Sequence, residues 1–454
     1  MKRRVVVTGA LLLILAIGVV GVPQLHTLIQ SALGLAARQA CSLHLAAGME
    51  LPLARETYID RHIRPLGPYV KIEVSNSAKT AHASLLGVFS QEAQWRPGYG
   101  CVLDHGRAIH TPTPYEKPSA QTVEVNQLAR AANFDAQALD AAIDDAFVEP
   151  DPEAPRQTSA VLVLSQGELV GERYRDGISA STPLPGFSMA KSFTATLIGL
   201  LVHHKGLDVH EVVPDAGLLT QAGVTYDQLL RMTSGVGVAE DGSGLDGNSI
   251  MLTHTHDAAA FAMQQPLHHP PGAAYEYTGG SSIILAQQFV NIAGQGDPSA
   301  AYAFLADNLL HPMGLNSVVL ETDGVGTFLG SSFMLASALD WAKLGQLYLQ
   351  NGVWNGQQLL PDTWTQYVST KTPQSGARDY GAGFWVAVDG GRDQRHAHLP
   401  VPPADALFMH GMMNQAVYIL PSQQLVVVRL GATRSYLQSG EWEFLAGVLK
   451  SHRN

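Results

Sequence analysis

Two pairs of apolar strands, one in the middle of the chain and one near its end, constrain the fold more than any other feature. The first pair is Ala160–Leu164 and Glu168–Tyr174, and the second is Ala416–Leu420 and Leu425–Leu430. Each pair flanks a short polar turn, which predicts an antiparallel β-hairpin. The long stretch between the pairs carries helical patterns, so we predict an α+β fold in which both ends of this region build one antiparallel sheet flanked by helices. A mostly helical subdomain would cover one side and leave a cleft at the join.

The helix expected after the first hairpin begins with the sequence Ser188-Met-Ala-Lys191. Apolar residues at Phe193, Leu197 and Leu200 recur at helical spacing, which predicts a helix from Ser188 onward. Three residues make roughly one turn, so the Ser188 hydroxyl and the Lys191 amine would lie side by side. A serine hydroxyl needs a neighbouring base, and Lys191 can serve if burial and the positive helix end depress its pKa. The pattern favours a serine acyl-transfer enzyme, although about one Ser-x-x-Lys is expected by chance in a chain of this length.

Shorter signals place helices and turns between the two strand pairs. Capping boxes at Thr225–Gln228 and Ser337–Asp340 predict helix starts. Lys205-Gly206 is typical of a helix end, and Asn355-Gly356 of a tight hairpin. Further helices are expected from Asp257 to about Gln265, over Ser282–Ile292 and over Glu441–Ser451.

The first 22 residues differ in composition from the rest of the chain. Lys2-Arg3-Arg4 precede an uncharged apolar run from Val5 to Val22. This is the pattern of either a signal peptide or a membrane anchor, and a run about long enough to span a bilayer favours an uncleaved anchor. Basic residues ahead of the run keep the N-terminus in the cytoplasm, which places the remaining chain outside, in the periplasm or exported.

Residues 23–120 are a mixed segment ahead of the region that carries the motifs, and residues 121–454 are expected to form one large domain. Apolar pieces at Tyr69–Val74 and Ala83–Ser90 predict strands. The segment is therefore expected to be a small domain or an extension of the large one.

Cys41 and Cys101 are the two cysteines of the chain. An even pair beyond an export signal suits a disulfide in an oxidising compartment, with two buried free thiols as the alternative. A bridge would close a loop of about 60 residues and contribute about 4 kcal/mol of stability.

Composition and charge exclude several functional classes. The 454-residue chain is 46% hydrophobic, enough for a large core, and carries 28 basic against 39 acidic residues, a net charge of −11. With no basic block beyond the N-terminus, nucleic acid is not an expected partner. Thr253-His-Thr-His256-Asp257 resembles metal-binding spacing, but an Ala-rich run follows where a further ligand is needed, so it predicts a helix-capping turn. Gln394–His398 has no convergent carboxylate, and we expect neither a metal nor an organic cofactor.

The motifs, taken together and in order, resemble those of the serine β-lactamase-like hydrolases. The resemblance is to the branch of class C β-lactamases, D-alanyl-D-alanine carboxypeptidases, esterases and 6-aminohexanoate-dimer hydrolases, and is greatest for the last. It covers about residues 125–450 and implies a covalent acyl-enzyme formed on an amide or ester, from a small-molecule or short peptide-like substrate. The segments that carry it are Ser188–Thr194, Leu229–Gly235, Pro270–Gly272, Tyr277–Gly280, Ser331-Ser332, Asp340-Trp341 and Leu425–Gly431.

The resemblance implies a role for each matching residue. Ser188 matches the family nucleophile and Lys191 its base. Tyr277 matches the tyrosine whose hydroxyl passes a proton to the leaving group, with Tyr275 as the competing choice two residues away. The backbone N–H groups of Ser188 and Met412 match the two donors of the oxyanion hole.

Four further residues are expected to bind substrate, namely Gly279, His410, Gly411 and Asn414. Gly279 stands where many β-lactamases of this branch have Asn, and Met409-His410-Gly411 stands where they have Lys-Thr-Gly. Because that Asn and Lys help to hold a β-lactam, an efficient β-lactamase is not expected. Asn414 stands where related hydrolases tend to have glycine, which could crowd the site. His410 could contact substrate or be a strand-end histidine without a catalytic role.

Two other functions stay open on the sequence. One is an enzyme of the D-alanyl-D-alanine carboxypeptidase or β-lactamase type, which shares the same machinery. The other is a catalytically silent envelope binding module. The presence of Ser188, Lys191 and Tyr277 together speaks against the silent module.

Overall fold

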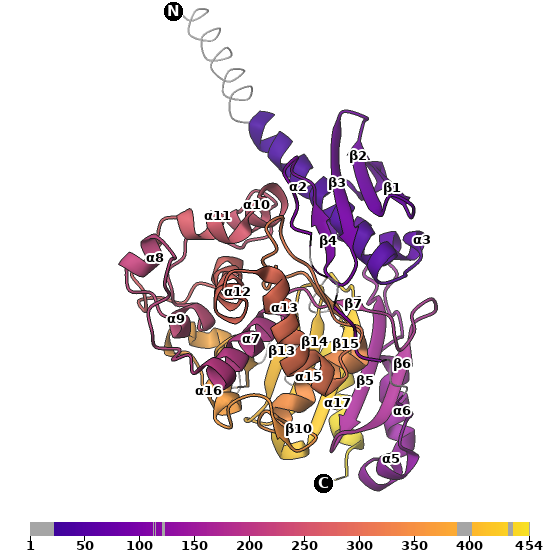
Figure 1. Ribbon diagram of the computed structural model, residues 1–454. Coiled ribbons are helices and arrows are strands. Elements are labelled where there is room, and N and C mark those ends of the chain that lie inside the picture. Colours follow the sequence, from indigo (N-terminus) through magenta and orange to yellow (C-terminus); the bar gives the residue numbers. More distant parts are fainter. Residues whose placement is uncertain are drawn as a thin grey trace, which may run out of the picture.

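The two predicted hairpins join into one sheet. In the computed structural model, which describes residues 22–111, 113, 115–119, 123–387, 402–434 and 439–453, six strands form an antiparallel sheet in the order β12-β13-β14-β15-β5-β6 (Figure 1). β5 pairs with β6 and β14 with β15, so both hairpins are confirmed, and Val427 of β15 lies opposite Val163 of β5. The strands are β5 (Thr158–Ser165), β6 (Glu168–Tyr174), β12 (Trp385–Val386), β13 (Leu407–Gly411), β14 (Gln415–Leu420) and β15 (Leu425–Gly431).

Helices cover both faces of this sheet, because successive residues of a strand point to opposite sides. On β5, Val161 and Val163 belong to a buried cluster with helices α6 (Ala136–Asp145) and α17 (Glu441–Ser451). Ala160 and Leu162, which alternate with them, join the larger core together with helices α7 (Met189–Lys205) and α15 (Ala338–Leu349). Burial on both faces explains why β5 and β15 are continuous apolar runs in the sequence.

A mostly helical region lies between β6 and β12 in the sequence. Figure 1 shows α8 to α12 grouped on one side of the central sheet, next to α7, which gives the expected α+β arrangement. Two small sheets accompany them, one in the order β7-β9-β8 and one of β10 and β11. The elements are β7 (Leu184–Pro185), α8 (Leu218–Gln221), α9 (Tyr226–Leu230), α10 (Gly247–His254), α11 (Ala258–Gln264), α12 (Gly279–Ala293), α13 (Pro298–Leu305), α14 (His311–Met313), β8 (Val319–Leu320), β9 (Met334–Ala336), β10 (Val353–Trp354), β11 (Gln357–Gln358) and α16 (Trp364–Ser369), with α5 (Gln127–Asn133) ahead of α6.

The local start and stop signals are confirmed where the structure tests them. Thr225 forms both hydrogen bonds of a capping box with Gln228, and the Ser337 hydroxyl accepts from the Asp340 N–H. Asp257 caps α11 by accepting from the Ala260 N–H, as the predicted turn requires. α12 begins three residues earlier than expected, because Thr278 caps it.

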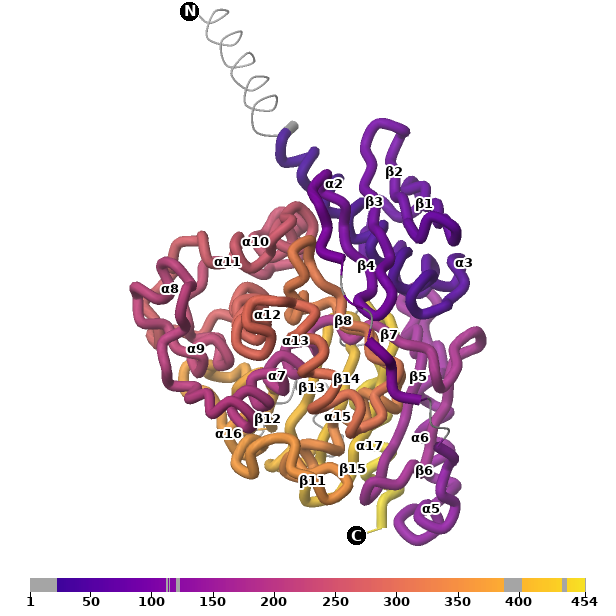
Figure 2. Tube along the Cα trace, viewed as in Figure 1, coloured from indigo at the N-terminus to yellow at the C-terminus, as the bar shows by residue number. Residues whose placement is uncertain are grey.

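The N-terminal segment folds as a helix against a sheet. α2 (Val22–Ala40) packs on a four-stranded antiparallel meander of β1 (Val70–Ser75), β2 (Thr80–Leu85), β3 (Phe89–Arg96) and β4 (Gly100–Leu103) (Figure 2). The predicted strand Ala83–Ser90 is therefore wrong, since Leu86 and Gly87 take φ angles of 55° and 69° and turn the chain between β2 and β3. Short helices α3 (Leu51–Ala54) and α4 (Asp60–His62) link α2 to β1.

A disulfide and a buried carboxylate fasten this segment together and to the large domain. Cys41 is bonded to Cys101, as the cysteine count predicted. The Glu321 carboxylate, next to β8, accepts hydrogen bonds from the Ser42 hydroxyl and from the Cys101 N–H, the latter at 3.1 Å. Arg96 donates to the Thr322 hydroxyl at 2.6 Å. The disulfide thus lies close to Glu321, the residue that follows β8 of the small sheet β7-β9-β8.

The predicted membrane segment, residues 1–22, lies outside the described residues except for Val22, the first residue of α2. Among the helices of the described part of the chain, none combines the length and the apolar character needed to cross a bilayer.

Candidate active site

Ser188 stands at the start of α7, immediately after a strained turn. Ser188 occupies the N-cap position of α7 with φ −64° and ψ −6° and makes no capping hydrogen bond through its side chain. Phe187 before it has φ 46°, a region that bulky residues rarely occupy. Ser188 is partly exposed, whereas the helix is buried from Met189 through Leu201. The helix ends at Gly206 with φ 70°, as Lys205-Gly206 predicted. The turn therefore leaves Ser188 partly exposed at the start of a buried helix.

The Lys191 ammonium lies beside Ser188 and has three acceptors. Its Nζ is 3.2 Å from Ser188 Oγ, 3.2 Å from Glu240 Oε1 and 3.2 Å from the carbonyl oxygen of Ser331. The Lys191 side chain is only 1% exposed and the Glu240 side chain 19% exposed. One helical turn brings the hydroxyl and the amine together as expected, and Ser331 belongs to one of the motifs that carried the family resemblance.

The expectation that the pKa of Lys191 is depressed is wrong, because the Glu240 carboxylate lies beside it. Burial alone lowers the pKa of Lys191, but the Glu240 carboxylate, with a contribution from Tyr277, outweighs it and holds the pKa above its ordinary value. Lys191 is therefore an ammonium in this state, not the depressed amine that burial and the helix end predicted. One signal for such a partner is present in the sequence, because a lysine inside an apolar helix needs a counter-ion.

Tyr277 completes the cluster. Lys191 Nζ lies 4.5 Å from the centroid of its ring, which also packs against Tyr380 and Trp385 at centroid distances of 5.7 and 5.6 Å. Burial raises the pKa of Tyr277, Lys191 opposes the rise and Glu240 adds to it, so the phenol stays protonated. Tyr275 packs on Tyr380 at 5.7 Å, and its buried hydroxyl has no hydrogen-bond partner among the described residues. Of the two tyrosines, Tyr277 is the one placed on Lys191.

The end of strand β13 comes close to the turn that carries Ser188. A Cβ atom added to Gly411 would come within 3.0 Å of the Gly186 carbonyl oxygen, a distance that real Cβ atoms do not adopt. Gly411 therefore allows β13 to approach the backbone two residues before the nucleophile. Met412 follows in the turn between β13 and β14, with its side chain 49% exposed.

Two of the predicted substrate-binding side chains are engaged elsewhere. His410 Nε2 is 3.5 Å from Glu441 Oε1 on α17. Alternate residues of β13 face opposite sides, and Gly411 faces Gly186 in the turn before Ser188. Asn414 has φ 63° in the tight turn after β13, and its buried side chain donates to the Thr433 carbonyl at 2.9 Å. Both side chains thus have partners within the fold, and their role in substrate binding stays a prediction.

Gly279, the other predicted contact, is the first residue of α12 and leaves space for Asn248. A Cβ atom at Gly279 would come within 3.0 Å of Asn248 Oδ1. This buried oxygen has no hydrogen-bond partner among the described residues. An amide from α10 thus occupies the space beside Gly279, where the resemblance expected an Asn side chain in β-lactamases, and sequence reasoning missed it because the two residues are far apart in the chain.

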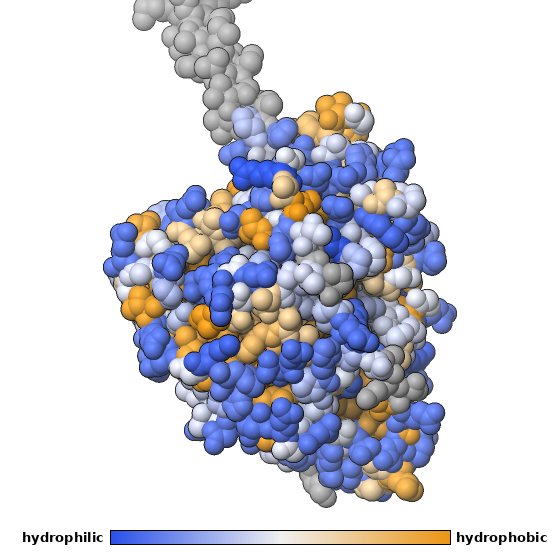
Figure 3. All heavy atoms as spheres, viewed as in Figure 1, coloured by the Kyte–Doolittle hydropathy of each residue, from blue (hydrophilic) through white to orange (hydrophobic). Residues whose placement is uncertain are grey.

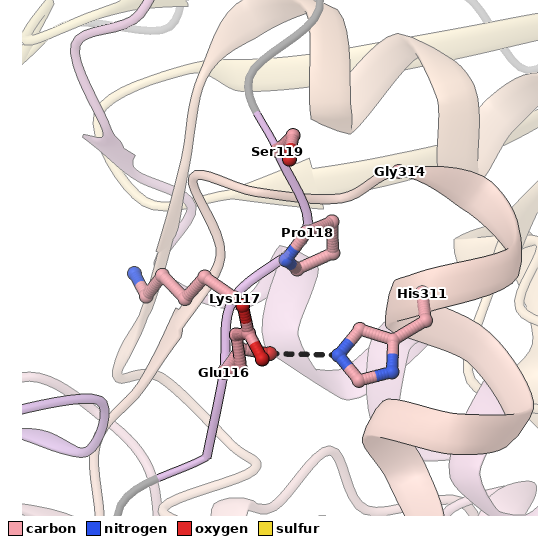
Figure 4. A pocket seen from close by; sticks show the side chains of 6 residues that line it. All are labelled: Glu116, Lys117, Pro118, Ser119, His311 and Gly314. Carbon is pink, nitrogen blue, oxygen red and sulfur yellow. Dashed lines mark hydrogen bonds between the residues drawn. The ribbon is translucent and has the colours of Figure 1, made fainter.

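A separate cavity lies away from these residues. It has a volume of about 350 Å³ and is lined by Glu116, Lys117, Pro118, Ser119, His311 and Gly314 (Figure 4). His311 Nε2 lies 2.7 Å from the Glu116 carbonyl oxygen, and Lys117 points away from the imidazole. Within the ranges that the structure describes, no group of three His, Cys, Asp or Glu side chains could hold a metal ion, and Gln394–His398 lies outside those ranges.

Comparison with known proteins gives relatives along most of the chain. The family model of the beta-lactamases matches residues 143–441. A 6-aminohexanoate-dimer hydrolase of Paenarthrobacter ureafaciens is 23% identical over 306 residues, which are 62% of this chain and 76% of that protein.

Two solved structures show the same fold at low sequence identity. One is assigned as a 6-aminohexanoate-dimer hydrolase from Bacillus anthracis, with a TM-score of 0.54 and 21% identity over 74% of this chain and 89% of that chain. The other is a penicillin-binding protein homologue from Caulobacter crescentus, with a TM-score of 0.54 and 15% identity over 73% of this chain and 100% of that chain.

Proposed function

Because the chain belongs to the beta-lactamase family, we propose that it is a serine hydrolase that cleaves an amide or ester through a covalent acyl-enzyme on Ser188. The observation that carries the proposal is the 3.2 Å contact between Lys191 Nζ and Ser188 Oγ, with Tyr277 packed against the same ammonium. A hydroxyl with two proton carriers beside it is the arrangement that nucleophilic catalysis by serine needs.

The chemistry follows from these contacts. Once Lys191 has lost a proton to solvent, Ser188 Oγ attacks the substrate carbonyl and gives its own proton to the Lys191–Tyr277 pair. The Ser188 and Met412 N–H groups stabilise the oxyanion, each worth about 3 kcal/mol of transition-state stabilisation. Tyr277 passes the proton to the leaving group, and water then releases the acyl group by the reverse sequence of proton transfers.

The substrate that we propose is a small, linear amide or ester, of the kind suggested by the name of the 6-aminohexanoate-dimer hydrolase relative. Met409 and Gly279 stand where β-lactamases of this branch have Lys and Asn, which removes two groups that hold a β-lactam. A carboxypeptidase or β-lactamase is therefore the second choice.

A catalytically silent binding module has one observation in its favour. The ion pair between Lys191 and Glu240 keeps a proton on the group that should take one from Ser188. This alternative predicts that Ser188 does not react with an acylating or phosphonylating reagent at any pH.

The test is labelling of the full chain with a fluorophosphonate, compared with Ser188→Ala. We expect one adduct on the wild type and none on the variant, whereas an equal signal from both, or from neither, would contradict the proposal. Rates on p-nitrophenyl esters, short linear amides and nitrocefin then separate the esterase, amidase and β-lactamase alternatives. The result expected is measurable turnover of the first two classes and little of nitrocefin.

We also propose that residues 1–22 anchor the protein in the inner membrane, with the catalytic domain in the periplasm or exported. Support comes from the basic residues ahead of the apolar run. Leu86 and Val88 are exposed in the turn between β2 and β3. Phe89, the first residue of β3, packs against His26 near the start of α2, so this turn lies beside the end of α2 that follows the proposed anchor (Figures 1 and 3). Carbonate extraction and protease protection of membrane vesicles test this proposal. Release of the protein by carbonate, or digestion of the catalytic domain from the cytoplasmic side of the membrane, would contradict it.

A further inference from the structure

We propose that Glu240 is a positioning residue that holds the proton on Lys191 and thereby sets the pH at which Ser188 becomes a nucleophile. The inference rests on the proposed function, since it concerns how the Ser188 site is switched on. Glu240 was not among the residues that the sequence motifs selected.

The contacts of Lys191 fix its protonation state. Its three hydrogen-bond partners, Ser188 Oγ, Glu240 Oε1 and the Ser331 carbonyl, all lie at 3.2 Å. These three acceptors suit an ammonium, which donates protons and accepts none, and Tyr277 is a further contact of the same group. While Lys191 donates to Ser188 Oγ, it cannot remove the Ser188 proton. The resting site is therefore inactive until the Lys191 ammonium loses a proton.

Two hydrogen bonds to the backbone just before Glu240 hold the loop that carries it in place. The Thr278 hydroxyl donates to the Val238 carbonyl at 2.6 Å, and the Asn248 N–H donates to the Ala239 carbonyl at 2.9 Å. Thr278 follows Tyr277 directly, so the loop that carries Glu240 is tied to the segment that carries the second proton carrier. The fold therefore positions Glu240 beside Lys191 through contacts of the loop backbone.

Glu240 retains an unused acceptor at this point. Its Oε2 atom is buried and has no hydrogen-bond partner among the described residues. Among the described residues, the hydrogen bond that the Glu240 side chain makes is therefore the one from Lys191.

The titratable groups around the pair give the direction of the effect. Glu240 and Tyr277 face Lys191, and Tyr275, Tyr277 and Tyr380 face Glu240. Burial pulls the pKa of Lys191 down and Glu240 pushes it up. Replacing the carboxylate by an amide of the same shape removes the upward contribution and leaves the burial in place. The pKa of Tyr277 also falls, since Glu240 raises it.

The experiment measures the rate constant of Ser188 phosphonylation by a fluorophosphonate against pH, in the full-length wild type and in Glu240→Gln. The expected result is a rise with pH in both, with the midpoint about 1–3 pH units lower in the variant, the range seen when a neighbouring charge is removed. Glu276→Gln is the matched control. The Glu276 carboxylate lies one residue before Tyr277, but it is paired with His268 Nδ1 at 2.9 Å. The midpoint of the pH–rate curve of Glu276→Gln should therefore match that of the wild type.

Three results would overturn the inference. They are an unchanged midpoint in folded Glu240→Gln, an equal shift in Glu276→Gln, and loss of labelling at every pH in folded Glu240→Gln. If Glu240→Gln does not fold, Glu240→Asp is the test variant. Its shorter side chain moves the negative charge away from Lys191, so the midpoint should shift in the same direction by a smaller amount. A wild type that is not labelled at any pH would instead overturn the proposed function itself.

Discussion

The closeness of two backbone segments, the end of β13 and the turn before Ser188, can be tested with one methyl group. Gly411→Ala places a Cβ atom within 3.0 Å of the Gly186 carbonyl oxygen. The obstacle is backbone, not the flexible end of a side chain, so the clash can be relieved only by moving β13, the turn, or both. Such a movement separates Met412 from Ser188, the two proposed oxyanion donors.

The size of the effect follows from this geometry. Relieving the contact needs a displacement of about 1 Å, and a misplacement of that size typically costs about 10²-fold in rate. The overpacking itself costs about 1–3 kcal/mol in free energy of unfolding. We therefore expect a variant that remains folded but acylates Ser188 about 100 times more slowly.

The assay combines phosphonylation of Ser188 with urea unfolding, and Gly34→Ala is its control. Gly34 lies inside α2, and a Cβ atom there would meet only side chains, the nearest 3.3 Å away on Leu103 and Thr253. The control should keep the wild-type rate and stability. A wild-type rate in Gly411→Ala would refute the reasoning, since β13 would then not form part of the site.

The remaining predictions concern proton transfer and stability. Lys191→Ala should abolish acylation of Ser188, and Tyr277→Phe should slow turnover by about 10²-fold or more, both measured by ester hydrolysis; near-normal rates would mean that the proton carriers are misassigned. Replacing Cys41 and Cys101 by Ser should lower the free energy of unfolding by about 4 kcal/mol in urea, and a loss below about 1 kcal/mol would contradict the loop-entropy argument. Burial raises the pKa of Glu321 to about 7. A raised folded-state pKa gives stability that is present below the unfolded pKa and lost as pH rises through 7, so the wild type should lose up to about 3 kcal/mol relative to Glu321→Gln between pH 4.5 and 7, and a flat difference would contradict this.

The parts of the fold that could be predicted are those fixed by local signals. The hairpins were visible because β5, β14 and β15 are apolar runs bounded by turn residues, and α17 was predicted with the bounds that the structure has. The contact between Ser188 and Lys191 was predictable because one helical turn fixes it. Errors arose where a turn carried no turn residue at its first position, as at Leu86 between β2 and β3.

The parts of the site that could not be predicted depend on long-range packing. Glu240 and Asn248 reach the site from other segments, and their neighbours in sequence do not mark them. The partner of His410 could not be predicted, because the side of β13 that faces the turn before Ser188 is fixed by Gly411 packing on Gly186. Once that side is known, strand alternation directs His410 to α17.

The most direct test of the account is to trap the acyl-enzyme. The full chain is mixed with a p-nitrophenyl ester, quenched in acid within the first turnovers, digested and examined by peptide mass spectrometry. The account predicts the acyl mass on the peptide that contains Ser188, in wild type and not in Ser188→Ala. Ester turnover with no adduct, or with the acyl group on another residue, would contradict it.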